Sequence, residues 1–511
     1  MTGLGWTVVL GFAVTGLIAY GEGAATQPLR TNHECPVPAD PNWTRQEIFV
    51  WNHVCVGADA DFTSEPGYGG TIDPQQPAGL PNSRVLNSSF IETILLNEKY
   101  SGALTRLGVV IVGARFNEPI DLADANLGRD LTLKDSLLEK GANFRGLRSK
   151  HRISFSGSKI AGVLDMAELH AEQLDLSKSR ITDGLIMNYI EATDGLFMDN
   201  GEFSRVDLRT ARIGKEFDLT KVRIAGELNM ERVVTTGGVF IGEGAEVKGP
   251  IYFVFGNCES FELAGGTFHQ NIDLTGTRIA NALVLKSRHG STHWAGKPLL
   301  ILRNVTADTV QDSPDSWPHK LDLVGFTYRT FGGVDEHGLG TVADRRIEWF
   351  VDWLGKGSYS PQPYEQLAQV LRAQGAPGDS DRILYAGRER TRHNSSGLDY
   401  LWQSTLKFVI GYGYHVWRAV LWLGIVWLIG AFVQWTRPSA RGNSIGQLLV
   451  YSFEMLLPVF RLRGQTRDFR SRPQDIWFHI QGLLYHLHNG LNRGIFEVSG
   501  GNCWLFLLPE V

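Results

Sequence analysis

This sequence has no large excess of charge of either sign. Its 511 residues carry 49 Lys and Arg against 54 Asp and Glu, a formal net charge of −5. Over residues 104–290 the balance is as close, with 23 basic and 25 acidic side chains. A protein that binds nucleic acid needs a strongly basic surface, and a mimic of nucleic acid needs a strongly acidic one. We therefore expect no nucleic-acid partner.

Cysteine is also scarce, with 4 residues in the whole chain. Two of them, Cys35 and Cys55, are 20 residues apart in the similar stretches NHEC and NHVC. If this segment is exported, oxidation to a disulfide is the expected outcome, and such a loop contributes about 3 kcal/mol. Free thiols and a metal site that includes His33 and His53 are the alternatives, although zinc sites usually place more than one residue between paired ligands.

What the chain has in abundance is a repeat of about 11 residues. Lines such as LDLSKSRITDG (174–184), FDLTKVRIAGE (217–227) and IDLTGTRIANA (272–282) share apolar residues two apart. Seventeen such units begin between Val109 and Leu283, and successive starts are 10–12 residues apart. A period of 11 residues is also found in right-handed coiled coils. Apolar residues two apart, with Gly or β-branched residues in most units, instead indicate short strands and corners.

Two units make one coil of about 22 residues, and a single unit cannot bury its apolar residues alone. The sequence therefore predicts a mainly β fold, a right-handed parallel β-helix with roughly eight coils in this region and a length of about 38 Å. Each buried Leu, Ile or Phe is expected to contribute roughly 1.5–3 kcal/mol. Glycine, with 58 residues, and Asp or Asn are expected at the corners. The segments 299–305 and 321–328 continue the pattern, and an excursion at 286–320 interrupts it.

Two stretches, ANLGR (125–129) and ANFRG (142–146), match the A-(D/N)-L-x-x pattern of pentapeptide-repeat proteins. The segments 359–375 and 411–423 are similar to the C-terminal part of bacterial membrane-anchored pentapeptide-repeat-like proteins, and the resemblance covers roughly residues 40–460. It implies a pentapeptide-like β-helix attached to a membrane. Because some relatives are labelled membrane-associated oxidoreductases, it also implies oxidoreductase activity as a hypothesis to test.

Two apolar runs predict export and membrane attachment. Residues 6–20 have the length of a signal-peptide core and precede small residues, so 1–25 is expected to be a signal peptide or an uncleaved anchor. Residues 416–435 carry one charge, Arg418, and at ~1.5 Å per residue they reach across a bilayer core of ~30 Å. A buried core helix is the alternative. Arginines are more frequent after this run than before it, which predicts that the C-terminal tail is cytoplasmic and the β-helix lies outside. Together with the resemblance to bacterial proteins, this orientation implies a bacterial inner-membrane protein whose β-helix faces the periplasm.

The expected organisation has six segments. They are a signal peptide or N-terminal anchor (1–25), an N-terminal segment with a capping helix (26–103), the β-helix (104–333), a helical region with an αα-hairpin (334–410), the transmembrane helix (411–436) and a basic tail with short apolar segments (437–511). Within the tail, residues 445–460 are too short for an easy span and contain Glu454. We expect this segment to lie at the interface or to re-enter the membrane.

No motif predicts a catalytic, cofactor-binding or metal-binding residue. The stretch HGLGTVAD (337–344) contains G-x-G-x-x-A, but no βαβ pattern surrounds it, and we interpret it as a glycine linker. The constant spacing leaves no room for the long loops that form the clefts of polysaccharide lyases and hydrolases. Acidic residues recur at one position of the unit and are interpreted as solvated or corner residues: Asp121, Asp175, Asp207, Asp218 and Asp273.

Two clusters of histidine and tryptophan complete the candidates. The excursion is expected to be a capping loop, with a pocket as the alternative, and it contains His289, His293, Trp294 and Trp317. The tail histidines indicate an interfacial amphipathic helix rather than a metal site, and they are His479, His486 and His488.

The sequence thus favours a non-enzymatic scaffold that is anchored in the membrane and presents a flat face or an open edge of its β-helix to a protein or other envelope partner. Two alternatives come from other classes of protein. One is a membrane-associated oxidoreductase, and the other is a small channel-like protein that uses residues 416–460.

Overall fold

The computed structural model describes residues 35–456, apart from 71–72, 77–80, 289, 333, 336–337, 340–344, 415 and 437–443. The chain forms two compact units that divide between Ser395 and Ser396. The expected signal peptide, His33, His289, the tail histidines and Cys503 lie outside the described residues, so the interpretations that concern them stay predictions.

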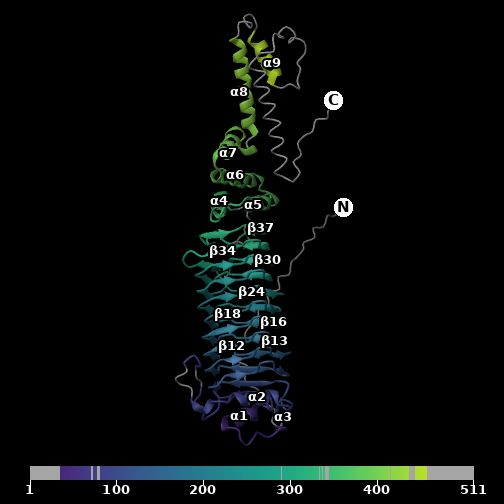
Figure 1. Ribbon diagram of the computed structural model, residues 1–511, viewed down its shortest axis with the longest axis vertical. Coiled ribbons are helices and arrows are strands. Elements are labelled where there is room, and N and C mark those ends of the chain that lie inside the picture. The colour runs from purple at the N-terminus through teal and green to yellow at the C-terminus, as the bar shows by residue number, and fades with distance from the viewer. Residues whose placement is uncertain are drawn as a thin grey trace, which may run out of the picture. The chain divides into compact units, whose positions relative to one another are not determined.

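The first unit is a parallel β-solenoid, in which the short strands of successive coils stack in register (Figure 1). The strands of the solenoid form three sheets, which we call A, B and C. Sheet C takes one strand from each coil, and its ten strands show that there are ten coils. Its strands are β4 (Ile120–Asp121), β8 (Ala142–Asn143), β12 (Val163–Asp165), β15 (Gly184–Ile186), β18 (Val206–Asp207), β22 (Leu228–Asn229), β26 (Ile251–Tyr252), β29 (Ile272–Asp273), β34 (Leu299–Ile301) and β36 (Lys320–Asp322).

Sheet B forms a second side of the solenoid and has nine strands. They are β3 (Arg115–Phe116), β7 (Leu137–Leu138), β11 (Lys159–Ile160), β14 (Arg180–Ile181), β17 (Glu202–Phe203), β21 (Arg223–Ile224), β25 (Glu246–Val247), β28 (Thr267–Phe268) and β33 (His293–Trp294). In each of these strands the first side chain points outward and the second faces the core, apart from Leu137, which is also buried.

Sheet A has sixteen strands, because it combines the strand that ends one coil with the strand that begins the next. They are β1 (Ala60–Asp61), β2 (Val109–Val112), β5 (Asn126–Leu127), β6 (Leu131–Lys134), β9 (Arg148–Ser149), β10 (Ile153–Ser154), β13 (His170–Asp175), β16 (Glu191–Phe197), β19 (Arg212–Ile213), β20 (Glu216–Asp218), β23 (Val234–Thr235), β24 (Gly238–Phe240), β27 (Asn257–Glu262), β30 (Arg278–Val284), β35 (Thr306–Gln311) and β37 (Thr327–Gly332).

The register follows the sequence period. Leu164 pairs with Leu185, Leu185 with Val206, and Val206 with Leu228, so that equivalent residues are 21–22 positions apart. The predicted parallel β-helix with about 22 residues per coil is confirmed. The coils beyond residue 290 bring the total from the expected eight to ten.

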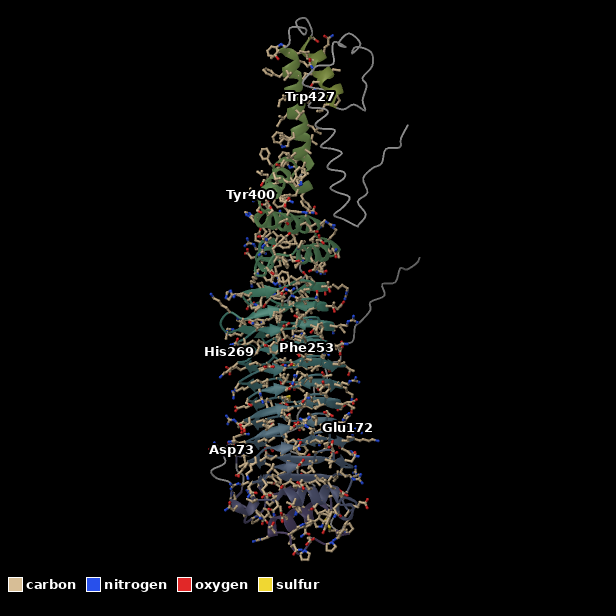
Figure 2. The ribbon with its side chains drawn as sticks, viewed as in Figure 1. Asp73, Glu172, Phe253, His269, Tyr400 and Trp427 are labelled. Atoms are coloured by element: carbon tan, nitrogen blue, oxygen red, sulfur yellow. A yellow bond between two sulfur atoms is a disulfide. The ribbon has the colours of Figure 1, made fainter. Side chains whose placement is uncertain are left out.

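The core lies inside the coils and is a continuous stack of apolar side chains. Phe217, Phe253 and Phe261 are each 0% exposed. In Figure 2, Phe253 lies within the solenoid, whereas Glu172 and His269 project from its surface. Because each buried large side chain contributes roughly 1.5–3 kcal/mol, this stack is the main source of the rod's stability.

The corners recur about every 11 residues, at residues with positive φ. Glycine and Asp or Asn were expected there, and some corners hold them, but others hold different residues, among them Lys178, Tyr189 and Thr210, with φ of 57°, 63° and 61°. The left-handed conformation costs such residues about 1–2 kcal/mol. Backbone bonds to the next coil offset this cost, since Tyr189 N donates to Arg209 O at 2.9 Å and Thr210 N to Glu231 O at 2.8 Å.

Where a corner does hold glycine, a side chain of the preceding coil often occupies the space above it. A Cβ on Gly157 would lie 2.0 Å from Oδ1 of Asp135, one coil earlier. A Cβ on Gly325 would lie 2.0 Å from Oδ1 of Asn304. Glycine is therefore required at these corners both for its positive φ and for lack of space.

The N-terminal end of the rod is covered. Strand β1 pairs with β2 of the first coil, with Ala60 opposite Ile111, and Leu86 N donates to Arg115 O at 2.9 Å. The helices of this end are α1 (Arg45–Val54), α2 (Ser88–Leu96), α3 (Glu98–Ser101) and the 3₁₀ turn η2 (Asn82–Arg84). Thr44 and Glu47 form a capping box at the start of α1, and Glu47 Oε1 also accepts from Asn87 at the start of α2.

The C-terminal end of the rod is covered by α4 (Ile347–Gly355), α5 (Pro361–Ala373) and α6 (Pro377–Asn394). Two glutamines of α5 bond to the backbone of the last coil. Gln362 accepts from Gly325 N at 2.9 Å and donates to Phe326 O at 3.0 Å, and Gln366 donates to Tyr328 O at 2.6 Å. Three of the backbone groups that a further coil would use are thereby satisfied, and this helps to protect the end strand from pairing with another molecule.

The second unit is helical. It contains α7 (Gly397–Ile410), the 3₁₀ turn η4 (Gly411–Gly413), α8 (Val416–Trp435) and α9 (Ile445–Leu456). Among the described residues, one helical segment, Trp417–Trp435, is long and apolar enough to cross a membrane, and 11% of its most apolar stretch is buried by protein.

Candidate functional site

The cysteines of the two His-x-Cys stretches meet at the end of α1. A disulfide joins Cys35 to Cys55, whose Cα atoms are 5.4 Å apart. The side chain of His53 turns back along its own helix, where Nδ1 lies 2.8 Å from the carbonyl oxygen of Phe49. The bond attaches the start of the described chain to α1, which is a structural role.

Neither a cluster of metal ligands nor a reactive thiol is present in the described part of the chain. No three His, Cys, Asp or Glu side chains are grouped there as ligands for a metal ion. Cys258 is buried in the solenoid, and burial raises the pKa of its thiol to about 12. A thiol with so high a pKa stays protonated near neutral pH and is a poor nucleophile.

The glycine-rich stretch at 337–344 is described only at Gly338 and Leu339. These residues form β39 (Gly338–Leu339), which pairs antiparallel with β38 (Val334–Asp335). A dinucleotide-binding turn lies between a parallel strand and a helix of a βαβ unit. The antiparallel pair is a different arrangement and gives no support to a nucleotide site.

The excursion at 286–320 is built into the solenoid. Its first part is an antiparallel pair, β31 (Lys286–Ser287) with β32 (Gly290–Ser291), after which β33 returns to sheet B. The indole of Trp294 donates to Ser316 O at 2.7 Å. The indole of Trp317 donates to the buried carboxylate of Asp312, which also accepts two bonds from Arg345. These aromatic residues therefore stabilise the end of the rod.

The recurring acidic residues are the last residues of their strands, three positions before a corner with positive φ. In each, a carboxylate oxygen accepts a hydrogen bond from the backbone N–H two residues later, at 2.8–3.2 Å. They are Asp121, Asp175, Asp207, Asp218 and Asp273. Aspartate is common in turns because its side chain can form this bond.

A cluster of carboxylates on sheet A has perturbed acidity. Burial, followed by the charges of Asp218 and Asp194, raises the pKa of Glu216. Burial is also the main cause that raises the pKa of Asp218. Asp194 pairs with Lys215, with Oδ1 and Nζ 2.5 Å apart. Burial, with repulsion between neighbouring carboxylates as the smaller cause, accounts for these raised pKa values without a catalytic role.

Sheet B contains the hollow that we regard as the candidate binding site. It has a volume of about 370 Å³, and small side chains form its floor. These are Thr182, Ser204 and Ala225, which occupy the same position in successive coils. The equivalent residue of the next coil is Lys248, which borders the hollow.

Charged side chains of alternating sign form the rim of the hollow. Arg180 Nη2 lies 2.9 Å from Glu202 Oε2, and Arg223 Nη1 lies 3.1 Å from Glu202 Oε1. In the next coil Glu246 pairs with His269 at 3.3 Å. Because the side chains of Arg180 and Arg223 are 45% and 69% exposed, these pairs hold only weakly. A partner with its own charges can replace them at small cost.

No family model, no curated protein and no solved structure matches this chain. The resemblance to pentapeptide-repeat-like proteins is supported at the level of the parallel β-solenoid and one apolar helix that could cross a membrane.

The hollow was missed in the sequence. Its signal is a column of small residues at the ninth position of alternate units, Thr182, Ser204 and Ala225, where other units have larger side chains such as Glu139. Alignment in units of 22 residues rather than 11 makes this column visible.

Proposed function

We propose that this protein is a non-enzymatic scaffold of the bacterial inner membrane, whose β-solenoid faces the periplasm and binds an extended segment of a protein partner in the hollow of sheet B. The observation that carries the proposal is the hollow itself, which is lined by a row of small side chains and, beside it, a row of charged side chains of alternating sign.

The face is a better candidate than an edge. Both end coils are covered, by β1 and α2 at one end and by the glutamines of α5 at the other. A partner strand would have to displace these segments. The outer face of sheet B needs no such rearrangement.

The dimensions of the hollow fit an extended chain. Its floor residues follow one another along the rod at the strand spacing of about 4.8 Å, so the four coils from β14 to β25 cover roughly 14–19 Å. An extended polypeptide rises about 3.3 Å per residue and would place about five residues there. Thr182 and Ser204 offer hydroxyl groups, and the rim offers both signs of charge.

The second unit supports the membrane attachment that we propose. Helix α8 is 20 residues long, and Trp417 and Trp435 lie near its two ends, where interfacial aromatic residues are common. Helix α7 exposes Leu398, Leu401 and Phe408 by 84%, 61% and 67%, as expected for an amphipathic helix at a membrane surface. The arginines that follow α8 favour a cytoplasmic location for the C-terminal tail.

The test is to fill the hollow. Ala225→Arg places a long charged side chain on its floor, and Ala280→Arg makes the same change on the exposed outer face of β30 in sheet A. Each full-length variant is isolated from native membranes after cross-linking through a photoreactive amino acid at Ser204. We expect a discrete adduct that Ala225→Arg abolishes and Ala280→Arg preserves.

Two results would contradict the proposal. Equal adduct formation in both variants would show that the hollow is not the binding surface. A nicotinamide or flavin that co-purifies with the full-length protein would instead favour the oxidoreductase alternative.

A further inference from the structure

Within the second unit, two hydrogen bonds join α9 to the middle of α8. The indole N–H of Trp427 donates to Leu449 O at 2.9 Å, and Ser452 Oγ donates to Trp427 O at 2.8 Å. The first bond satisfies a side-chain donor of α8, and the second satisfies a side-chain donor of α9. Figure 2 labels Trp427, the residue of α8 that takes part in both bonds.

Small residues allow the two helices to approach closely. Gly430 and Ala431 of α8 are buried, and Leu448 of α9 is 3% exposed. Nearer the connection between the helices, Phe432 and Ile445 border an apolar hollow of about 170 Å³. Small residues at the contact are typical of helix pairs within membranes, where close packing replaces the hydrophobic effect.

The position of Trp427 sets the depth of this contact. It lies 11 residues after the first residue of α8, or about 16 Å along a helix of about 30 Å. If α8 spans the bilayer, Trp427 is near the midplane, away from the interface where tryptophan is usually found. Its N–H then needs a partner that is also within the hydrocarbon, because water is absent there.

We infer that α9 is inserted in the bilayer beside α8, so that the anchor is a helical hairpin and lipid acyl chains cover the free side of α9. This inference rests on the proposed membrane span of α8. It assigns Leu449 and Ser452 to the same depth as Trp427, well inside the hydrocarbon region.

Among the residues of α9 whose side chains the structure describes, three large apolar ones are available to acyl chains. Ile445, Val450 and Phe453 are 71%, 48% and 37% exposed. Gln447, in the first turn, is also exposed. At the start of α9, Ser444 and Gln447 bond to each other's backbone N–H groups at 3.2 and 3.4 Å, which satisfies donors that hydrocarbon could not.

The experiment measures which solvent surrounds α9 in the full-length protein. Cys503→Ser provides the background, because Cys258 is buried and Cys35 is bonded to Cys55. A nitroxide is then attached at Val450→Cys in α9. The controls are Ile429→Cys on α8, which is 52% exposed, and Val234→Cys on the rod, which is 44% exposed. Each protein is reconstituted in vesicles of phosphatidylcholine and phosphatidylglycerol.

Collision rates with oxygen, which concentrates in hydrocarbon, and with a water-soluble nickel chelate are compared by electron paramagnetic resonance. We expect the oxygen-to-nickel ratio at position 450 to match that at 429 and to exceed that at 234 several-fold. A ratio at 450 that matches 234, with 429 still in lipid, overturns the inference and leaves the span intact. Low access to both reagents at 450 also overturns it, because protein would then cover α9. Water-like ratios at both 429 and 450 mean that the proposed span itself has failed.

Discussion

The rod and the helical unit use apolar side chains in opposite ways. In residues 35–395, six large apolar side chains are exposed among those described, and they are scattered over the surface. In the much shorter helical unit, seventeen are exposed among the described residues. Helix α7 has no buried residue, whereas every coil of the rod has an apolar interior.

This difference in exposed apolar side chains indicates that the two units have different surroundings. Isolated exposed apolar residues are normal in a protein surrounded by water, but a dense group of them marks an interface with another protein or with lipid. The exposure of the rod fits a surface in water, and that of the helical unit fits an interface with lipid or with another protein. We expect the largest effect from removal of the helical unit and the smallest from a change at a corner of the rod.

Removing the helical unit should change the solvent that the protein requires. A chain that ends at Ser395 keeps both caps of the rod and loses α7, α8 and α9. We expect it to fractionate with water-soluble proteins and to retain the circular dichroism of a β-rich fold, whereas the full-length protein requires detergent. A truncated chain that stays in the membrane would place an anchor elsewhere, with residues 1–25 as the first candidate.

Within the rod, a large interior side chain should be essential and an exposed one dispensable. Phe217 is 0% exposed, so Phe217→Ala should lower the free energy of unfolding by about 3–5 kcal/mol. Phe255 is 61% exposed, and Phe255→Ala should change this free energy by less than about 1 kcal/mol. Denaturant unfolding of both variants checks the comparison, and similar losses would argue against a packed interior.

A charge on the surface should distinguish the two solvents. Ile429 of α8 and Val234 of the rod are similarly exposed, at 52% and 44%. Ile429→Lys should oppose membrane insertion by roughly 2.5–3.5 kcal/mol, because the ammonium group would face hydrocarbon. Val234→Lys should be nearly silent. The fraction of protein that resists alkaline extraction from membranes measures the effect, and equal retention would contradict a lipid-facing α8.

The smallest effect concerns the corners of the rod. Gly157 has φ of +70°, and a Cβ would meet the Asp135 carboxylate, so Gly157→Ala should cost about 1–2 kcal/mol. Gly128→Ala is the matched change at a residue with ordinary φ and open space, and it should stay within about 0.5 kcal/mol of the wild type. Thermal unfolding of the two variants gives the difference, which would vanish if the corner could relax.

The rod could be predicted because the apolar residues that specify it recur with a constant period in the sequence. The alternation of apolar residues appears in every unit, and pairs such as Leu164 and Leu185 follow directly from a constant spacing. The non-glycine corners at Tyr189 and Thr210 were not predicted, because stacking against the neighbouring coils outweighs the local preference of each residue.

The contacts between distant segments could not be predicted from the sequence either. The packing of Ser452 against Trp427, and of Gln362 against the last coil, joins segments that no shared period relates. The hollow depends on the size of side chains, whereas the pattern that revealed the rod depends on their polarity. The sequence therefore identified the architecture more readily than the candidate site.

The glutamines of α5 have a consequence for how the rod can change in evolution. Since they bond to the last coil as another coil would, the closing helices are indifferent to how many coils precede them. Duplication or loss of one block of about 22 residues would lengthen or shorten the rod by about 4.8 Å and leave the closing helices in place. The solenoid is in this sense a molecular ruler, graduated in coils, whose length genetic duplication can reset.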